Sequence, residues 1–433
     1  MLSRPLLILA LVLTGFAGDP VPPAPGGSTL PPLPEPVTVA GVAGIITTTA
    51  DDQWPVQFYL PKSLGGSEAV GTKGKGQSQP TRPKPDIVVW FPPAAKHLRA
   101  ILLIPNNSDS ISFGTWPALR EVAIRREMAV VYLRRFETAF EHRAGAPDKD
   151  TLATLLPIIA ELTRIPDFRH APWVTFGKSS RGEFPFRLAW LQPERTIASI
   201  TYHGETPTWP MLPWAKGKDA TVLQVNVNGE TEWMGTWYRH VRPCLLNYRA
   251  KTAWLPHQAI SYGIGHGDYS ESAPTKEAQA KAASPTKISR DRVFNYLALF
   301  VDKALVLRVP TGAYPTDAPI ALKQVDPDQG WLIHSRAAEE LLKLKWRPLR
   351  SSEGVYQIVD HVKEPTEVYA EQQDAIDPAL LIRRATDVPA AERRNYFWVA
   401  DQELADAWRA LHTRTPIAPV DPATPPAATP AKP

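Results

Sequence analysis

A chain of 433 residues is long enough for one large domain with a smaller appendage. Its apolar fraction of 43% and its 14 tryptophans indicate a packed core and exclude a largely disordered protein. The formal net charge of +4 is small for this length, and no block of lysine and arginine accompanies it. We therefore expect a globular protein whose partner is not a nucleic acid.

The N-terminus is typical of an export signal. Arg4 precedes a short apolar run, LLILALVL at 6–13, and the small residues Gly15 and Ala17 follow as at a cleavage site. The run is too short to cross a bilayer as a helix. We predict a signal peptide over 1–17, no transmembrane segment after its cleavage, and a secreted or periplasmic protein. An uncleaved anchor is the alternative. Cys244 is the only cysteine, which excludes an internal disulfide.

Proline-rich segments border the predicted folded region. Residues 18–40 and 413–433 contain few large apolar side chains, so we predict an extended linker and a disordered tail there. A polar stretch at 63–86 predicts a loop between early strands.

Between these segments, apolar runs alternate with amphipathic stretches. Leading antiparallel strands are predicted at 41–48, 56–60 and 87–91. Continuous apolar runs, typical of parallel strands buried on both faces, follow at 100–105, 128–133, 173–176, 197–202 and 222–227. Helices are predicted at 115–127, 149–164, 183–192, 233–250 and 288–305. The alternation predicts an α/β fold with a doubly wound, mostly parallel sheet over 41–305.

The stretch WVTFGKSSRGEFPFR at 173–187 places a strand, a Gly-x-Ser turn and a helix in succession. Such a turn lifts a nucleophilic hydroxyl above the sheet edge, and it requires small neighbours. Gly177 stands two residues before Ser179, but Arg181 occupies a position where the usual pattern has a small residue, and Gly182 follows it. We predict Ser179 as a nucleophile, with Ser180 as the alternative. A plain turn between strand and helix is the non-catalytic interpretation.

Two later loops supply an acid and a base. Asn228–Glu232 follows the strand at 222–227, and His266 lies between two glycines after the next candidate strand. Catalytic groups gather at the carboxyl ends of strands in open α/β sheets. The order of serine, acid and histidine is that of hydrolases with a strand–turn–helix nucleophile. We predict Glu232 as the acid, with Glu230 and Glu205 as weaker candidates, and His266 as the base; a solvated loop histidine is the alternative.

The stretch from about 88 to 305 resembles the α/β-hydrolase superfamily, most closely its dienelactone-hydrolase, secreted-esterase and prolyl-oligopeptidase-like branches. The residues that carry the resemblance are Gly177–Gly182, Gly229–Glu232 and Gly265–Asp268. It implies a catalytic triad of Ser179, His266 and Glu232, although most members use aspartate as the acid. The Ser180-Arg181 pair is also superficially similar to the Ser-Arg pair of glucuronoyl esterases.

The resemblance also implies an oxyanion hole. One donor would be the backbone N–H of Ser180, and the second would come from the loop at Asn106 or Asn107. We expect no cofactor and no metal. The predicted function is an exported carboxylic ester hydrolase that forms an acyl-enzyme. A non-catalytic binding or scaffold protein on the same fold and a prolyl-oligopeptidase-like peptidase are the alternatives.

Aromatic residues surround the predicted site. Trp209, Trp214 and Trp233 could bind the substrate, a small-molecule or polymer ester, because flat aromatic faces bind sugar, aryl and polyester groups. Trp233 and Trp237 lie four residues apart, however, as in a helix packed on a core. The oligomeric state does not follow from the sequence.

Residues 306–412 predict a smaller C-terminal α+β accessory region. Helical patterns occupy 336–345 and 401–412, and a strand-like run occupies 354–359. His334 and His361 are isolated from other metal-binding residue types, so we expect them to be surface residues.

Overall fold

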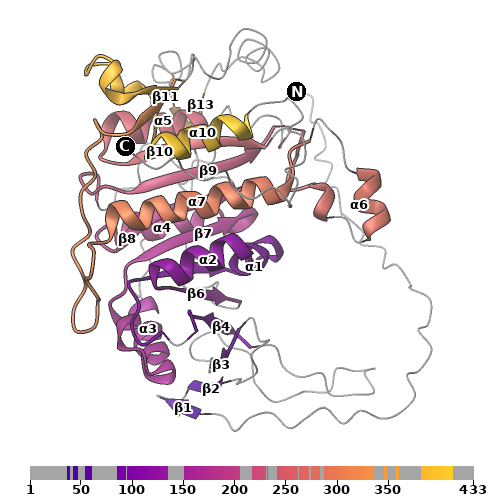
Figure 1. Ribbon diagram of the computed structural model, residues 1–433, viewed down its shortest axis with the longest axis vertical. Coiled ribbons are helices and arrows are strands. Elements are labelled where there is room, and N and C mark those ends of the chain that lie inside the picture. Colours follow the sequence, from indigo (N-terminus) through magenta and orange to yellow (C-terminus); the bar gives the residue numbers. More distant parts are fainter. Residues whose placement is uncertain are drawn as a thin grey trace, which may run out of the picture. The chain divides into compact units, whose positions relative to one another are not determined.

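The computed structural model shows one main sheet with helices on both faces (Figure 1). It describes residues 37–39, 42–46, 54–60, 85–93, 95–134, 151–204, 217–230, 232, 241–261, 263–272, 275–282, 287–334, 346–348, 357–359 and 382–412. All of them belong to the compact unit Glu35–Pro433. The predicted signal peptide, most of the linker and the tail lie outside the described residues.

The main sheet has ten strands in the order β1-β2-β3-β4-β6-β5-β7-β8-β9-β10. From β5 to β10 every neighbouring pair is parallel, whereas β1 to β4 extend the sheet in antiparallel pairs. The strands are β1 (Val37–Val39), β2 (Val42–Ile46), β3 (Val56–Tyr59), β4 (Ile87–Trp90), β5 (Ala100–Pro105), β6 (Met128–Leu133), β7 (Trp173–Lys178), β8 (Thr196–Tyr202), β9 (Leu223–Gly229) and β10 (Leu255–Ser261). The predicted mostly parallel sheet is confirmed, and β1 begins inside the segment predicted as a linker.

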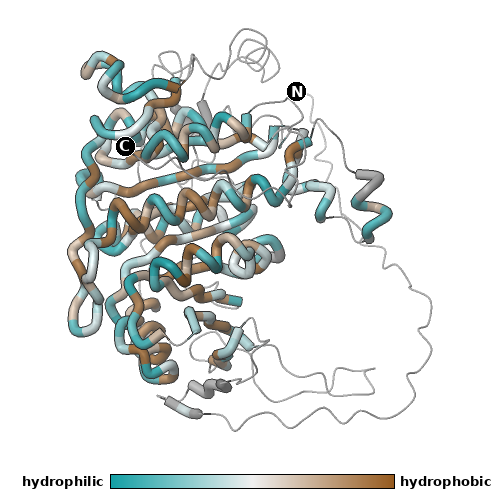
Figure 2. The backbone as a smooth tube through the Cα atoms, viewed as in Figure 1, coloured by the Kyte–Doolittle hydropathy of each residue, from teal (hydrophilic) through white to brown (hydrophobic). Residues whose placement is uncertain are grey.

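Every residue of β5 to β10 is buried, which explains the unbroken apolar runs of β5 and β6, whereas β9 also buries the polar side chains of Gln224 and Asn226. Alternate side chains belong to different core clusters: Leu102 and Ile104 pack on one face, and Ile101 and Leu103 pack on the other. Figure 2 shows the central strands as largely hydrophobic, while the helices α2 and α7 carry both hydrophobic and hydrophilic residues.

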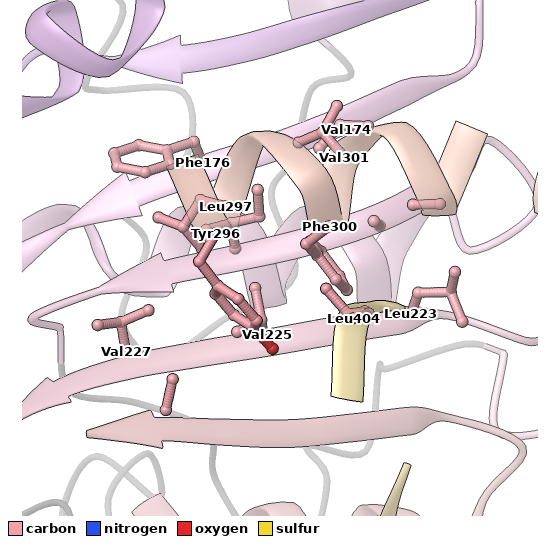
Figure 3. Close-up of a cluster of buried hydrophobic side chains, with 14 of the residues drawn as sticks. Val174, Phe176, Leu223, Val225, Val227, Tyr296, Leu297, Phe300, Val301 and Leu404 are labelled. Carbon is pink, nitrogen blue, oxygen red and sulfur yellow. The ribbon is translucent and has the colours of Figure 1, made fainter. Parts of the chain in front are cut away.

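Helices cover both faces of the sheet. The helices α2 and α7 pack together on one face, where Val174, Phe176 and Val225 meet Leu297 and Val301 (Figure 3). The helix α3 covers the other face with its leucines. The helices are α1 (Ser108–Gly114), α2 (Pro117–Arg126), α3 (Thr151–Thr163), α4 (Glu183–Leu191), α5 (Arg242–Lys251), α6 (Lys276–Ala282), α7 (Arg290–Arg308) and α10 (Gln402–Leu411), with 3-10 turns η2 (Pro166–Arg169), η3 (Ser179–Arg181), η6 (Ser270–Ser272), η8 (Ala385–Asp387) and η9 (Arg393–Asn395).

The predicted α+β appendage is confirmed, but its boundary is not at residue 305, because that residue lies inside α7. A three-stranded antiparallel sheet follows, formed by β11 (Trp331–Ile333), β14 (Ile382–Arg384) and β15 (Phe397–Val399). A separate pair is formed by β12 (Trp346–Pro348) and β13 (Gln357–Val359). The predicted helix at 336–345 lies outside the described residues, and the one at 401–412 is α10.

The appendage shares its core with the main sheet. Leu332, Trp398, Leu404 and Trp408 are buried in the same cluster as the residues of β9 and α7. The described residues of the accessory region thus pack into the same core as the main sheet.

Within the described residues, no helix is both long and apolar enough to cross a membrane.

Candidate active site

The turn at Ser179 joins β7 to α4 through the short η3 turn. Ser179 has a φ of 55°, which a residue with a side chain rarely adopts and which marks a tight, strained backbone. Its side chain is partly buried, whereas Ser180 is exposed. This is the geometry expected of a turn that presents one hydroxyl above the carboxyl end of a strand.

Two glycines make this turn sterically feasible. A Cβ on Gly177 would lie 2.1 Å from the carbonyl oxygen of Arg181 and 2.6 Å from Pro185, so no side chain fits there. A Cβ on Gly204, just after β8, would lie 2.8 Å from the Cα of Gly182. The turn therefore makes its close approach to the neighbouring strand at Gly182.

Ser179, His266 and Glu232 meet at the carboxyl ends of β7, β9 and β10. The Oγ of Ser179 lies 2.7 Å from Nε2 of His266, and the Nδ1 of that imidazole is hydrogen-bonded to Oε1 of Glu232. The end of β9 lies directly against the loop that carries His266. A Cβ added to Gly229 would come within 2.0 Å of the carbonyl oxygen of Gly265, so only glycine fits there. The structure thus brings together the three side chains that the sequence predicted as a triad.

Glu232 is a buried carboxylate held in its ionised form. Burial alone would raise its pKa, but hydrogen bonds from His203, His266 and the backbone N–H of Gly229 outweigh that effect and lower the pKa to about 2. An ionised carboxylate can orient an imidazole and stabilise its cationic form. Glu232 is therefore prepared for the role of the orienting acid at neutral pH.

His203 is a site residue that the sequence analysis missed. It follows β8, is fully buried, and has a φ of 46°. Its Nδ1 lies 3.3 Å from Oε2 of Glu232, and its Nε2 lies 2.7 Å from the hydroxyl of Tyr269. The available signal was a histidine followed by Gly204 at the carboxyl end of a buried strand, where catalytic groups gather.

Lys178, the residue before Ser179, is also buried. Its ammonium forms an ion pair with Asp109 in the first turn of α1. Burial lowers the pKa of Lys178 to about 8, against the attraction of Glu232, which raises it. The pair links the turn at Ser179 to the helix that follows the predicted oxyanion loop.

The predicted oxyanion residues Asn106 and Asn107 lie in the segment that joins β5 to α1. Asn106 and Asn107 follow β5, the neighbour of β7 in the sheet. Asn107 caps α1 by accepting a hydrogen bond from the N–H of Asp109, and Asn106 accepts one from the hydroxyl of Tyr132. Their side-chain oxygens thus hold the loop in shape, and the backbone N–H groups of this loop and of Ser180 remain the predicted donors.

Of the remaining predicted residues, the structure describes Glu230, which makes a different contact. The carboxylate of Glu230 accepts the N–H of Gly263 and thereby joins two loops. Glu205 and the three predicted substrate-binding tryptophans, Trp209, Trp214 and Trp233, lie outside the described residues. In the part of the chain that the structure describes, no group of three or more histidine, cysteine, aspartate or glutamate side chains is placed to hold a metal ion.

No protein-family model and no curated protein sequence matches this chain. Solved structures that are similar to it include a CIB-like hydrolase from Thermoplasma acidophilum, at 14% identity and a TM-score of 0.28, over 45% of this chain and 90% of that one. An S-formylglutathione hydrolase from Staphylococcus aureus matches at 10% identity and a TM-score of 0.29, over 51% and 91% of the chains. The siderophore hydrolase EstB from Aspergillus nidulans matches at 14% identity and a TM-score of 0.28, over 49% and 88%.

The fold follows from the chain's own topology. Its parallel strands β5 to β10 are flanked by helices on both faces, and the strand–turn–helix at Ser179 precedes Glu232 and His266 in chain order. By this strand order and by the strand–turn–helix at Ser179, the chain has the α/β-hydrolase fold.

Proposed function

We propose that this protein is an exported serine hydrolase that cleaves carboxylic esters through an acyl-enzyme. One observation carries the proposal: a continuous hydrogen-bonded chain runs from the hydroxyl of Ser179 through both nitrogens of His266 to the carboxylate of Glu232. A nucleophile in contact with a base, which is itself oriented by an acid, is the arrangement that acyl transfer requires.

The first half-reaction uses each of these atoms. Nε2 of His266 accepts the proton of Ser179 as the oxygen attacks the ester carbonyl, and the cationic imidazole is stabilised by Glu232. The oxyanion that forms is held by the N–H of Ser180 and by an N–H of the loop at Asn106 and Asn107. The imidazolium then protonates the leaving alkoxide, and the acyl group stays on Ser179.

In the second half-reaction the same groups act on water. His266 accepts a proton from a water molecule, which attacks the acyl-enzyme, and the carboxylic acid leaves as Ser179 recovers its proton. The two half-reactions together consume one ester and one water molecule, so neither step requires a cofactor.

Export and substrate size are supported by the sequence alone. The apolar run at 6–13 and the small residues after it support secretion or a periplasmic location. The tryptophans at 209, 214 and 233 support a substrate with flat or extended groups, such as a polymer ester.

Labelling with a fluorophosphonate probe tests the nucleophile. We expect wild-type protein and Ser180→Ala to be labelled and to hydrolyse p-nitrophenyl acetate, whereas Ser179→Ala should lose labelling and roughly 10⁵- to 10⁶-fold in turnover. Ser180→Ala is the matched control, because it removes the adjacent hydroxyl and leaves its backbone N–H. Folded wild-type protein that neither labels nor turns over would support a non-catalytic binding protein instead.

A substrate panel then separates the reaction classes. We expect activity on at least one of acetyl, feruloyl, methyl-glucuronoyl and aliphatic polyester substrates, and none on a prolyl-peptide amide. Faster cleavage of the amide than of every ester would contradict the esterase assignment and favour a peptidase.

A further inference from the structure

The carboxylate of Glu232 serves two imidazoles, not one. Its Oε1 is hydrogen-bonded to Nδ1 of His266. Its Oε2 is hydrogen-bonded to Nδ1 of His203 at 3.3 Å and to the backbone N–H of Gly229 at 2.9 Å. A carboxylate held at both oxygens cannot rotate about its terminal bond without losing contacts. The reaction proposed above uses only His266, so the second imidazole needs its own explanation.

The proton positions in this cluster follow from the partners. Glu232 is ionised and only accepts hydrogen bonds. Burial lowers the pKa of His203, although the hydrogen bond to Glu232 opposes this, so its ring is neutral and carries one proton. That proton must lie on Nδ1, facing the carboxylate, and Nε2 then accepts from the hydroxyl of Tyr269. Tyr269 in turn accepts from Ser261 at 2.7 Å, which completes a directed chain of hydrogen bonds.

The surroundings of His203 prevent its ring from turning. The rings of Tyr202 and Tyr269 meet it nearly edge-on, with centroids at 4.5 and 5.5 Å and interplanar angles of 88° and 83°. Its backbone N–H donates to the carbonyl of Val227 at 2.7 Å. The next residue, Gly204, lies against the nucleophile turn. The imidazole is thus fixed by three elements that also carry the triad.

We propose that His203 is a positioning residue, whose Nδ1–H holds Oε2 of Glu232 so that Oε1 stays directed at His266. The inference rests on the proposed serine hydrolase function and adds a fourth member to its hydrogen-bonded chain. It also assigns a role to Tyr269, which holds His203 in the tautomer that donates to the carboxylate.

The proposal predicts a change in pH dependence. The titratable groups that face Glu232 are His203 from the end of β8, His266 and Tyr269 from the loop after β10, and Lys178 from β7. Burial raises the pKa of Glu232, and the hydrogen bond from His203 lowers it. Loss of that donor should therefore raise the pKa of Glu232. The acid side of the pH–rate profile should then move to higher pH, because protonated Glu232 no longer orients the base.

Fluorophosphonate inactivation rates measured against pH provide the test. In His203→Phe we expect the pH-independent rate to fall by roughly 10- to 100-fold, as for other supporting residues of a site, and the acid limb to shift upward. His203→Asn keeps an N–H near the position of Nδ1 and should recover most of the rate and the wild-type limb. Tyr269→Phe should shift the acid limb of the pH–rate profile to higher pH by a smaller amount. If His203→Phe does not fold, an unshifted acid limb in folded Tyr269→Phe would contradict the inference.

His257→Phe is the matched control. This histidine is also buried and bonded to a tyrosine hydroxyl, that of Tyr296 at 2.7 Å, but it lies on β10 away from the triad. It should lose stability and keep the wild-type pH profile. Folded His203→Phe with the rate and acid limb of wild type would overturn the inference. Wild-type protein that is not labelled at all would instead overturn the hydrolase function on which the inference rests.

Discussion

Glu232 shows how a single residue can be both buried and charged. Burial disfavours its ionised form, but the two histidines and the N–H of Gly229 donate to it and reverse the balance. The same contacts that fix its geometry thus fix its charge. The cost is that the folded state depends on this carboxylate staying unprotonated.

Acid unfolding should report this dependence. The pKa of Glu232 is lowered from 4.5 to about 2 on folding, which corresponds to on the order of 3 kcal/mol of stability. Since the folded pKa is depressed, this contribution is fully present above pH 4.5 and is lost as the pH falls toward 2. In urea titrations at pH 7 and pH 3, wild-type protein should therefore lose more unfolding free energy than Glu232→Gln. Equal losses in the two proteins would contradict this assignment of the charge.

At the scale of elements, the Lys178–Asp109 ion pair joins the end of β7 to the first turn of α1. Both residues are buried. The pair connects the nucleophile turn with the segment that follows the predicted oxyanion loop, whose shape Asn107 holds by capping α1. The ion pair thereby ties together the two elements that act on one carbonyl group in the proposed reaction.

Breaking this pair should be costly. Asp109→Asn leaves a buried ammonium without its counterion and should lower the free energy of unfolding by about 3–5 kcal/mol, whereas the double variant Asp109→Asn, Lys178→Met should recover much of that loss. Denaturant titration measures both.

An exposed pair offers the comparison. Glu161 accepts from Arg169 at 3.2 Å with both side chains well exposed, so Glu161→Gln should change stability by less than about 1 kcal/mol. If Asp109→Asn lowered the free energy of unfolding by as little as Glu161→Gln, the buried ion pair would not be stabilising the contact between β7 and α1.

At the scale of the whole molecule, the C-terminal appendage completes the main sheet. The strand β10 is the last in the order of the main sheet, so among the described residues its outer side has no hydrogen-bonded strand, although β15 also packs near it. The helix α10 covers that side: the indole of Trp408 donates to the carbonyl of Gln258 at 2.8 Å, and the N–H of Ile260 donates to His412 at 3.0 Å. An uncovered edge is a site of aggregation. The appendage therefore protects the strand that leads into the His266 loop.

This packing predicts one cooperative unfolding transition. Trp408→Ala should lower the free energy of unfolding by about 3–5 kcal/mol, since it removes a buried indole from the shared core. Deletion of 401–433 should cause aggregation, while deletion of 413–433 alone, beyond α10, should be tolerated. Calorimetry that resolved two transitions, with only the weaker one moved by Trp408→Ala, would show that the appendage folds independently.

Local patterns in the sequence were sufficient to predict much of this protein. The unbroken apolar runs at 100–105 and 128–133 predict strands buried on both faces, and the structure confirms both. The turn at Ser179 is also local, because Gly177 and the hydroxyl are neighbours in the chain. The order of serine, acid and histidine then indicated which side chains should meet, since parallel strands end at one edge of the sheet.

Contacts between distant segments were decided only by the tertiary structure. His203 reaches Glu232 from the end of the neighbouring strand, Asp109 pairs with Lys178 from another element, and Trp408 contacts β10 from the C-terminal helix. None of these pairs has a periodicity or a spacing that sequence reading detects, because each depends on how the sheet brings separate strand ends and the last helix together. The sequence alone thus determined the central strands of the main sheet and the tight turn at Ser179, whereas folding determined which buried charges and hydrogen bonds support them.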